Sequence, residues 1–176
     1  LKYSNFPVIS APSGMALGGG CELLLHSNFV QAHVESYIGL TEAALGICPA
    51  WGGCKELLSR FENNKNIPNG PMPAIMKAFQ TIGLAKTSSS APEAREIGFL
   101  RSEDGITMNK DRLLHDAKLV AINLIETYVK PEKLTYRLPG RTAFAALELG
   151  LKGMFDNGQI SEHDKLIGHQ IATILS

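Results

Sequence analysis

Short apolar runs separated by glycine and proline mark the first third of the chain. Residues 7–11 concentrate β-branched side chains and then meet turn-forming residues at 12–14, which predicts a buried strand. Apolar and polar residues alternate at 30–34, and 37–40 is a shorter run of similar character. Because successive side chains of a strand point to opposite faces, both segments are predicted strands.

Two helices are predicted in the same region. Glycines 18–20 form a loop that opens into helix-forming residues at 21–26, with an acidic residue in the first turn, where the helix dipole favours negative charge. Residues 54–61 have a second helical pattern, and a polar, proline-interrupted connection follows at 63–73. The pattern therefore predicts an α/β arrangement for residues 1–73.

From residue 74 onward, apolar residues recur at spacings of three and four, the period of an amphipathic helix. A capping box at Ser90–Glu93 and Gly98 predict the start and stop of one helix. An Asp104–Gly105 turn between two short extended pieces follows. Asn109 as an N-cap and Pro131 as a stop then bound a second helix. Two further helices are predicted at roughly 142–155 and 161–175. Residues 74–176 are thus a mainly α-helical C-terminal region.

The chain has 17 Lys+Arg and 17 Asp+Glu residues, so its formal net charge is zero. Without a basic excess there is no electrostatic footprint of nucleic-acid binding, and nucleic acid is not an expected partner. No run approaches the ~20 apolar residues that a membrane helix needs, so membrane insertion is not expected. The three cysteines form no CxxC pair, which favours reduced thiols and a cytoplasmic location.

The glycine triplet 18–20 is the first candidate for chemistry. A glycine-rich turn that opens a helix offers unpaired backbone N–H groups, and the missing side chains let a substrate carbonyl approach them. The alternative is a tight turn that needs positive φ angles. The triplet does not fit the common phosphate loops, because GxxxxGK[ST] is absent and Leu23 stands where the third glycine of GxGxxG would fall.

Glu22 and Glu42 are the second candidate. Glu22 lies in the first helical turn beside the glycines, and Glu42 follows the strand-like segment 37–40. A strand-loop-strand return would bring both into one cleft, where two carboxylates orient a water, take its proton and return a proton to the substrate. Alternatively, Glu22 complements the helix dipole and Glu42 is a solvated loop acid.

No metal site is predicted. The five histidines fall on separate predicted elements, and Cys48 and Cys54 lack the spacing of zinc ligands. Trp51, between Pro49 and Gly52, is interpreted either as a core plug or as an apolar wall for a ligand, and the plug is the more common arrangement.

Three segments together, 13–23, 37–42 and 45–53, resemble the enoyl-CoA hydratase (crotonase) family in their order and spacing. Residues 91–100 are similar to a later segment of the family, in which a helix ends at glycine before an apolar strand. The resemblance implies an α/β fold, with a partial crotonase-like (ββα) spiral core over residues 1–73 followed by the helical region.

The rest of the chain, including 106–114 and 160–164, looks like the long bacterial 3-hydroxyacyl-CoA dehydrogenases that carry a crotonase-like region after an NAD-binding part. The chain starts without Met on an apolar run, so we expect a fragment of such a fatty-acid β-oxidation enzyme. A coenzyme A thioester is the implied substrate. No cofactor is expected in the fragment, and NAD is expected only in the N-terminal part of the parent.

The resemblance also implies roles for individual residues. Glu22 and Glu42 match the two family glutamates that handle water and proton during reversible hydration of a trans-2-enoyl-CoA. Gly19 matches a glycine whose N–H stabilises the developing oxyanion. The implied substrate-binding residues are Gly18, Ala50, Trp51 and Gly52.

The chain departs from the family in several places. The family's other oxyanion donor comes from a segment before the strand at 7–11, and Ala50, Cys54 and Asn28 replace the usual residues. We therefore expect little hydratase activity from the fragment alone. The alternatives are a degenerate crotonase domain that acts as an acyl-CoA-binding or assembly module, and an enoyl-CoA isomerase, in which one glutamate moves the proton. Having both glutamates favours hydration, and a homo-oligomer is expected by analogy with the fold.

Overall fold

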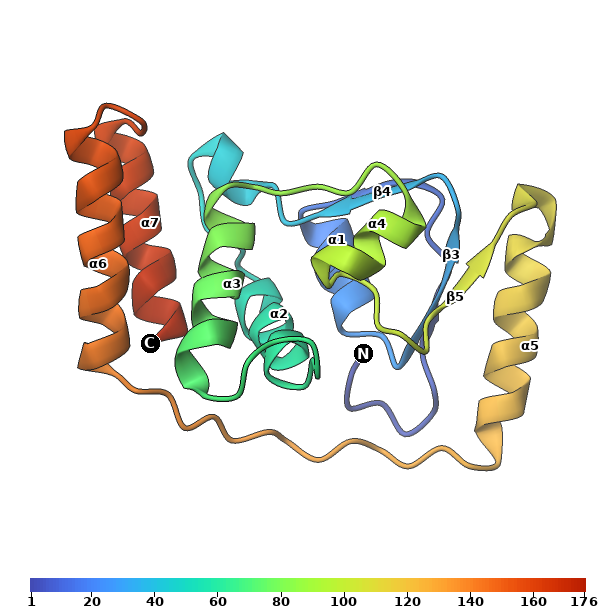
Figure 1. Cartoon of the computed structure of the whole chain (residues 1–176). Coiled ribbons are helices and arrows are strands. Elements are labelled where there is room, and N and C mark those ends of the chain that lie inside the picture. Colours follow the sequence, from blue (N-terminus) through green and yellow to red (C-terminus); the bar gives the residue numbers. More distant parts are fainter. The chain divides into compact units, whose positions relative to one another are not determined.

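The computed structural model describes all 176 residues and divides into two compact units (Figure 1). The first, here called the strand unit, comprises Leu1–Gly39 and Thr87–Thr135. The second, the helical unit, comprises Leu40–Lys86 and Tyr136–Ser176. Each unit combines segments that are far apart in sequence.

Parallel strands form the framework of the strand unit. β1 (Ile9–Ser10), β3 (Phe29–His33) and β5 (Gly105–Thr107) form one parallel sheet in the order β1-β3-β5. β2 (Gly14–Leu17) pairs in parallel with β4 (Ser36–Gly39) over their whole length. Each parallel pair needs a crossover between its strands, and the segment between β2 and β4 contains the helix that follows the glycine triplet.

Three α-helices belong to the strand unit: α1 (Gly19–Leu25), α4 (Ala91–Ile97) and α5 (Leu113–Ile125), the last preceded by a short 3-10 turn, η2 (Lys110–Arg112). α1 packs against β2, α4 against β4, and α5 against β1 and β3. Ser90 accepts a hydrogen bond from the Glu93 N–H and begins α4, while Gly98 ends that helix with a φ of 108°. These local signals agree with the predicted helix boundaries.

The strand unit also has a polar centre in the buried carboxylate of Asp104. One Asp104 oxygen accepts the Val30 N–H at 2.9 Å, and the other accepts the Arg101 N–H at 2.7 Å. The Arg101 guanidinium in turn donates to the carbonyls of Ser27 and Asn28 at 2.9 and 2.8 Å. A single acidic side chain therefore joins the loop before β5 to the start of β3.

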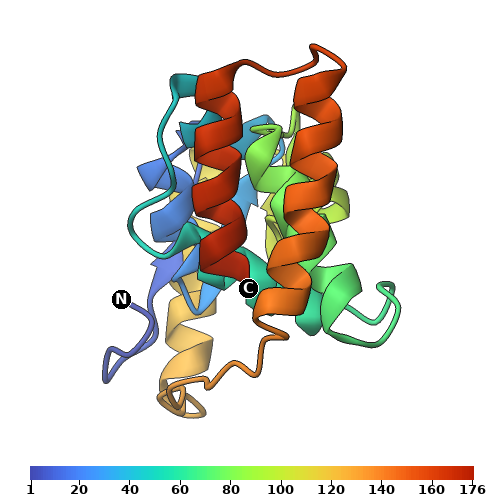
Figure 2. The same ribbon diagram turned by 90° about the vertical axis from the view of Figure 1, so that its left-hand side faces the viewer.

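The helical unit is built from a 3-10 turn and four helices: η1 (Glu42–Leu45), α2 (Gly53–Glu62), α3 (Pro71–Gly83), α6 (Arg141–Asp156) and α7 (Glu162–Leu175). Figures 1 and 2 show α6 and α7 side by side, joined by a short connection. Their apolar faces meet α3, and the central side chains are fully or almost fully buried, among them Ile75, Ile82, Leu147, Ile171 and Leu175. Burial of these apolar faces is the main source of stability for such helices.

Close packing and capping define the last two helices. Gly168 of α7 lies against Leu151 of α6, where an added Cβ would come within 2.5 Å of a Leu151 methyl carbon. Ser161 caps α7 by accepting the Asp164 N–H at 3.1 Å, and the Asp164 carboxylate accepts from the Ser161 N–H at 2.9 Å. This reciprocal capping box fixes the start of α7.

Several local predictions differ from the structure. Gly14, the last residue of the turn predicted at 12–14, begins strand β2 instead, since residues 14–17 pair with β4 more than 20 residues away in sequence. Only the second extended piece around Asp104 and Gly105 is a strand. The Glu93 carboxylate reaches back to Ser89 rather than to Ser90. Asn109 caps η2 rather than α5, so α5 begins four residues after Asn109 and ends at Ile125. None of the helices combines the length and apolar character needed to cross a membrane.

Candidate functional site

Gly18 makes the turn between β2 and α1. Its φ of 52° and ψ of −123° lie in a region that favours glycine. Its N–H donates to the Gly39 carbonyl at 2.9 Å, and its own carbonyl accepts the Glu22 N–H at 2.9 Å. The alternative interpretation of the triplet, a tight turn with positive φ, therefore describes Gly18.

Gly19 and Gly20 require a different explanation. Both are exposed residues at the start of α1, and neither has a positive φ angle. A Cβ added to either glycine would meet no atom within 4 Å. Glycine in a helix costs about 1 kcal/mol relative to alanine. Neither backbone conformation nor packing within the chain accounts for these two glycines, while the first N–H groups of the helix have no intrahelical acceptor.

Glu22 follows in the same turn of α1 and is 3% exposed. The Nδ1–H of His26 donates to the Glu22 carbonyl at 2.7 Å, which ties the end of this short helix to its first turn. The turn thus brings an acidic side chain, sheltered from solvent, next to backbone that lacks side chains.

Glu42 begins η1 in the helical unit and is 8% exposed. Gly46 ends η1 with a φ of 73°, and its N–H donates to the Ala43 carbonyl at 3.0 Å. The Gly46 carbonyl accepts a hydrogen bond from His163 Nε2 of α7 at 2.9 Å. The positive φ favours glycine at this position, and a Cβ there would lie 2.8 Å from that nitrogen and displace the His163 ring.

The loop before α2 exposes its apolar residues. Trp51 is 69% exposed and Ala50 is also exposed, so the interpretation of Trp51 as a core plug is wrong. Gly52 caps α2 with a φ of 91°. The buried face of α2 is formed by other apolar residues, among them Leu57, Leu58 and Phe61.

The structure groups the predicted residues by unit. Gly18, Gly19 and Glu22 share one strand-to-helix turn in the strand unit. Glu42 and the loop with Ala50, Trp51 and Gly52 belong to the helical unit. The joint cleft of Glu22 and Glu42, and the binding role of the loop, stay predictions.

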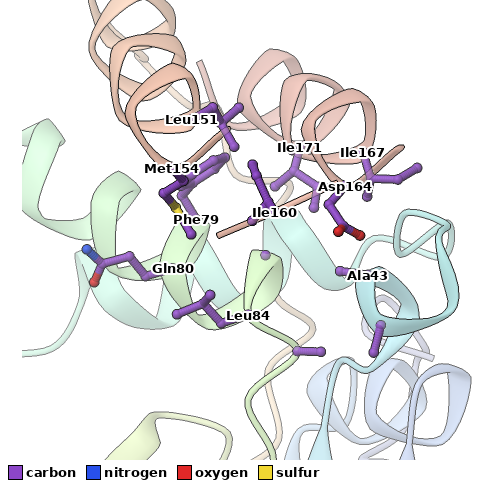
Figure 3. A pocket seen from close by; sticks show the side chains of 14 residues that line it. Ala43, Phe79, Gln80, Leu84, Leu151, Met154, Ile160, Asp164, Ile167 and Ile171 are labelled. Atoms are coloured by element: carbon purple, nitrogen blue, oxygen red, sulfur yellow. The ribbon is translucent and has the colours of Figure 1, made fainter. Parts of the chain in front are cut away.

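The helical unit also contains a cavity of about 370 Å³ that the sequence did not predict (Figure 3). η1, α3, α6, α7 and Ile160 between the last two helices contribute to its wall. The sequence indicates such a cavity only through small residues in its wall, which are Ala43, Ala44, Gly83 and Gly168. The signal is weak, because small residues serve equally well for close packing of helices.

Two groups around this part of the helical unit have shifted pKa values. Hydrogen bonds from the backbone and side chain of Ser161 hold the pKa of Asp164 below its usual value. Burial raises the pKa of the Cys48 thiol, whose sulfur lies 3.8 Å from the Ile167 carbonyl oxygen. Asp164 is thus the anion at the cavity wall, whereas Cys48 stays a neutral thiol at neutral pH.

Neither a dinucleotide fingerprint nor a cluster of metal ligands is found in the chain. Leu23 stands in place of the third glycine of the dinucleotide fingerprint, so the turn at Gly18 does not fit NAD. No three His, Cys, Asp or Glu residues lie close enough together to hold a metal ion. The chemistry available is that of backbone N–H groups and carboxylates.

Residues 1–65 match the family model described as enoyl-CoA hydratase/isomerase. The whole chain is 45% identical, over 177 aligned residues, to a protein of Bacillus subtilis strain 168 described as a probable 3-hydroxyacyl-CoA dehydrogenase. It is 37% identical over 123 residues, 70% of the chain, to a protein of Rickettsia prowazekii described as a fatty acid oxidation complex trifunctional enzyme. The chain spans 22% and 16% of the lengths of these relatives.

Solved structures give a consistent picture. The enoyl-CoA hydratase of Bacillus anthracis aligns with a TM-score of 0.52 and 26% identity, over 96% of this chain and 53% of that one. The enoyl-CoA hydratase of Mycobacterium tuberculosis H37Rv aligns with a TM-score of 0.53 and 23% identity, over 96% of this chain and 60% of that one. The chain therefore corresponds to about half of each solved enzyme.

Proposed function

We propose that the chain supplies residues for the hydration of a trans-2-enoyl-CoA. The premise is that the chain belongs to the enoyl-CoA hydratase/isomerase (crotonase) family. The solved relatives confirm the predicted crotonase-type α/β fold. The Rickettsia prowazekii relative is described as a fatty acid oxidation enzyme, and the Bacillus subtilis relative as a 3-hydroxyacyl-CoA dehydrogenase. The specific proposal is that Glu22 and Glu42 carry out the hydration.

One observation carries the proposal. Gly19 and Gly20 are exposed, lack positive φ angles and have open space where a Cβ would be, and they lie in the same first turn of α1 as the buried Glu22. A requirement for glycine that the chain itself does not impose is explained by a ligand that approaches the backbone. A thioester oxygen is such a ligand, because it gains negative charge as water adds to the double bond.

In the proposed reaction, Glu22 and Glu42 hold one water molecule. One carboxylate takes a proton from the water while the water oxygen bonds to C3 of the enoyl group, and a proton is delivered to C2. The electron pair of the C2–C3 double bond moves toward the thioester oxygen, where the Gly19 N–H donates a hydrogen bond. No oxidant or metal is needed, because the sum of the steps is the addition of water.

The proposal extends to the oxidation step that follows hydration. The product of hydration is a 3-hydroxyacyl-CoA, which is the substrate class named in the description of the Bacillus subtilis relative. We propose that NAD, used to oxidise that product, binds to residues outside these 176. Since the chain covers only 53–60% of the solved hydratases, we expect it to turn over crotonyl-CoA slowly by itself.

The test is Glu22→Gln and Glu42→Gln in the natural polypeptide that contains this chain. We expect each change to lower the kcat of crotonyl-CoA hydration by about 10²–10⁴, the usual contribution of a general acid or base. Glu35→Gln, which neutralises an exposed glutamate of the strand unit, is the matched control and should leave the rate unchanged.

Three results are informative. Unchanged hydration in both correctly folded variants would contradict the proposal and support a binding or assembly module. Loss in only one variant, together with conversion of 3-enoyl-CoA to 2-enoyl-CoA, would support an isomerase. Loss in both variants with native circular dichroism is the expected result.

A further inference from the structure

The turn η1, which begins at Glu42, is not held in place by large apolar side chains of its own. The two such residues at its end, Leu45 and Ile47, are 76% and 54% exposed. Ala43 and Ala44 border the cavity of about 370 Å³, so part of the space next to the turn is unfilled. Apolar burial, which fixes α3, α6 and α7, therefore contributes little to the placement of this turn.

Backbone hydrogen bonds close the turn on itself. The Gly46 N–H donates to the Ala43 carbonyl at 3.0 Å, and the Ile47 N–H donates to the Glu42 carbonyl at 3.1 Å. The second bond joins the residue after Gly46 directly to the backbone of Glu42. A contact that fixes Gly46 therefore also restrains the backbone of Glu42.

His163, in the first turn of α7, makes such a contact. Its Nε2 lies 2.9 Å from the Gly46 carbonyl oxygen, and because a carbonyl can only accept, Nε2 carries the donated hydrogen. The missing side chain of Gly46 allows this approach, since a Cβ there would lie 2.8 Å from the same nitrogen. Figure 3 shows the next residue, Asp164, on the side of the cavity where Ala43 of η1 lies. The start of α7 thus meets η1 through a directional bond.

The first turn of α7 is itself well fixed. The capping box of Ser161 and Asp164 brackets His163, with one partner before it and one after it. One turn further along α7, the Ile167 carbonyl oxygen lies 3.8 Å from the Cys48 sulfur. A capped helix start is therefore joined at two points to the chain that follows Glu42.

We propose that His163 is a positioning residue, which holds η1, and with it Glu42, through its hydrogen bond to the Gly46 carbonyl. The inference rests on the proposed function for the role of Glu42, and it adds to that role a residue 117 positions from Gly46 in sequence. His163 acts through the backbone of the turn and needs no contact with substrate. The position of the turn matters because an acid or base works only within hydrogen-bond reach, and a misplacement of about 1 Å can cost about 10²-fold in rate.

His163→Met and His163→Gln form a matched pair of variants. Both new side chains are unbranched, similar in length and good helix formers. Glutamine carries an amide N–H as many bonds from the backbone as the histidine Nε2, whereas methionine has no donor. His163 is exposed, so neither change leaves a hole in the core. His169→Met is the control on the same helix, because His169 bonds to Glu148 of α6 at 2.9 Å instead.

The first measurement is crotonyl-CoA hydration by the natural polypeptide that contains this chain. We expect His163→Met to lower kcat at least about tenfold and to change KM less than about twofold, because the turn is displaced while substrate binding is kept. His163→Gln and His169→Met should each stay within about threefold of the unmodified kcat. When Glu42→Gln is already present, His163→Met should lower kcat no further, because a residue that acts through another is not additive with it.

The second measurement does not depend on catalysis. Hydrogen exchange followed by mass spectrometry reports how often the backbone of residues 44–48 opens. These amides should exchange about 2–10 times faster in His163→Met, the effect expected for the loss of one hydrogen bond. His163→Gln and His169→Met should leave the exchange of this segment unchanged.

The two measurements separate this inference from the proposed function. If Glu42→Gln lowers hydration while folded His163→Met keeps its kcat, the inference is overturned and the proposed function stands. An equal loss from His163→Met with and without the Glu42 carboxylate also overturns it, because His163 would then act by another route. If Glu42→Gln leaves hydration unchanged, the proposed function fails, and unchanged exchange of residues 44–48 would overturn the inference as well. Should His163→Met fail to fold, His163→Ala removes the same donor, and the same criteria apply.

Discussion

The strand unit and the helical unit differ in what joins their distant segments. In the strand unit, the Asp104 carboxylate and the Arg101 guanidinium connect the loop before β5 to the start of β3 by hydrogen bonds to backbone groups. In the helical unit, α3, α6 and α7 meet through buried apolar side chains and leave a cavity among them. Directional bonds define single positions, whereas apolar contacts allow small adjustments of whole helices.

This difference suits the proposed role of the strand unit. An oxyanion donor works only when its N–H is held at a defined place, and the turn at Gly18 is fixed by backbone hydrogen bonds in the strand unit. Three sets of variants test the contrast between the units, in order of decreasing expected effect on stability.

Asp104→Ala should cause the largest loss. The change leaves the N–H groups of Val30 and Arg101 without their acceptors and the Arg101 guanidinium without its partner carboxylate. Breaking such a buried charged arrangement costs about 3–5 kcal/mol of unfolding free energy. Urea denaturation followed by circular dichroism measures it. Asp111→Ala, at an exposed position, is the control, and a similar loss in both variants would refute a special role for Asp104.

Matched leucine-to-alanine changes compare the adaptability of the two units. Leu24 of α1 and Leu147 of α6 are both almost completely buried. Such truncations cost about 2–5 kcal/mol, and the cost falls when the surroundings can collapse into the space. Because α6 borders an existing cavity, we expect Leu147→Ala to cost less than Leu24→Ala in the same urea titration. The reverse order would show that the helical unit is the less adaptable of the two.

Ser161→Ala should have a smaller effect, about 1 kcal/mol at neutral pH, because it removes one side of the capping box of α7. The effect should depend on pH. The pKa of Asp164 is lowered in the folded state, so the capping interaction stabilises the fold above the ordinary value of 3.8 and fades as the pH falls through the lowered pKa. Thermal unfolding of both proteins at pH 7 and near pH 3 measures the difference, which should shrink at the lower pH.

The local features of the candidate site were predictable from sequence. The glycine loop that opens a helix, the position of Glu22 in its first turn, and the Ser90 and Ser161 helix starts all depend on residues within one or two turns of each other. The hydrogen bonds of a helix start join residues that are near neighbours in sequence, which is why the sequence alone indicates where they form.

Features that depend on distant partners were missed or misread. β2 is a strand because β4 pairs with it, and its own sequence gives a turn signal at its start. The exposure of Trp51 follows from the filling of the α2 face by other residues. Its flanking residues carry no information about that packing.

The sequence by itself therefore determined the helix starts at Ser90 and Ser161, and it brought Gly19 and Glu22 into one turn. Only the tertiary structure decided that Asp104 bonds to Val30, 74 residues away, and that α3, α6 and α7 surround a cavity next to η1. The physical reason is the range of the forces involved. Local propensity acts over a few residues, whereas the burial of an apolar face or of a carboxylate depends on which distant segment covers it.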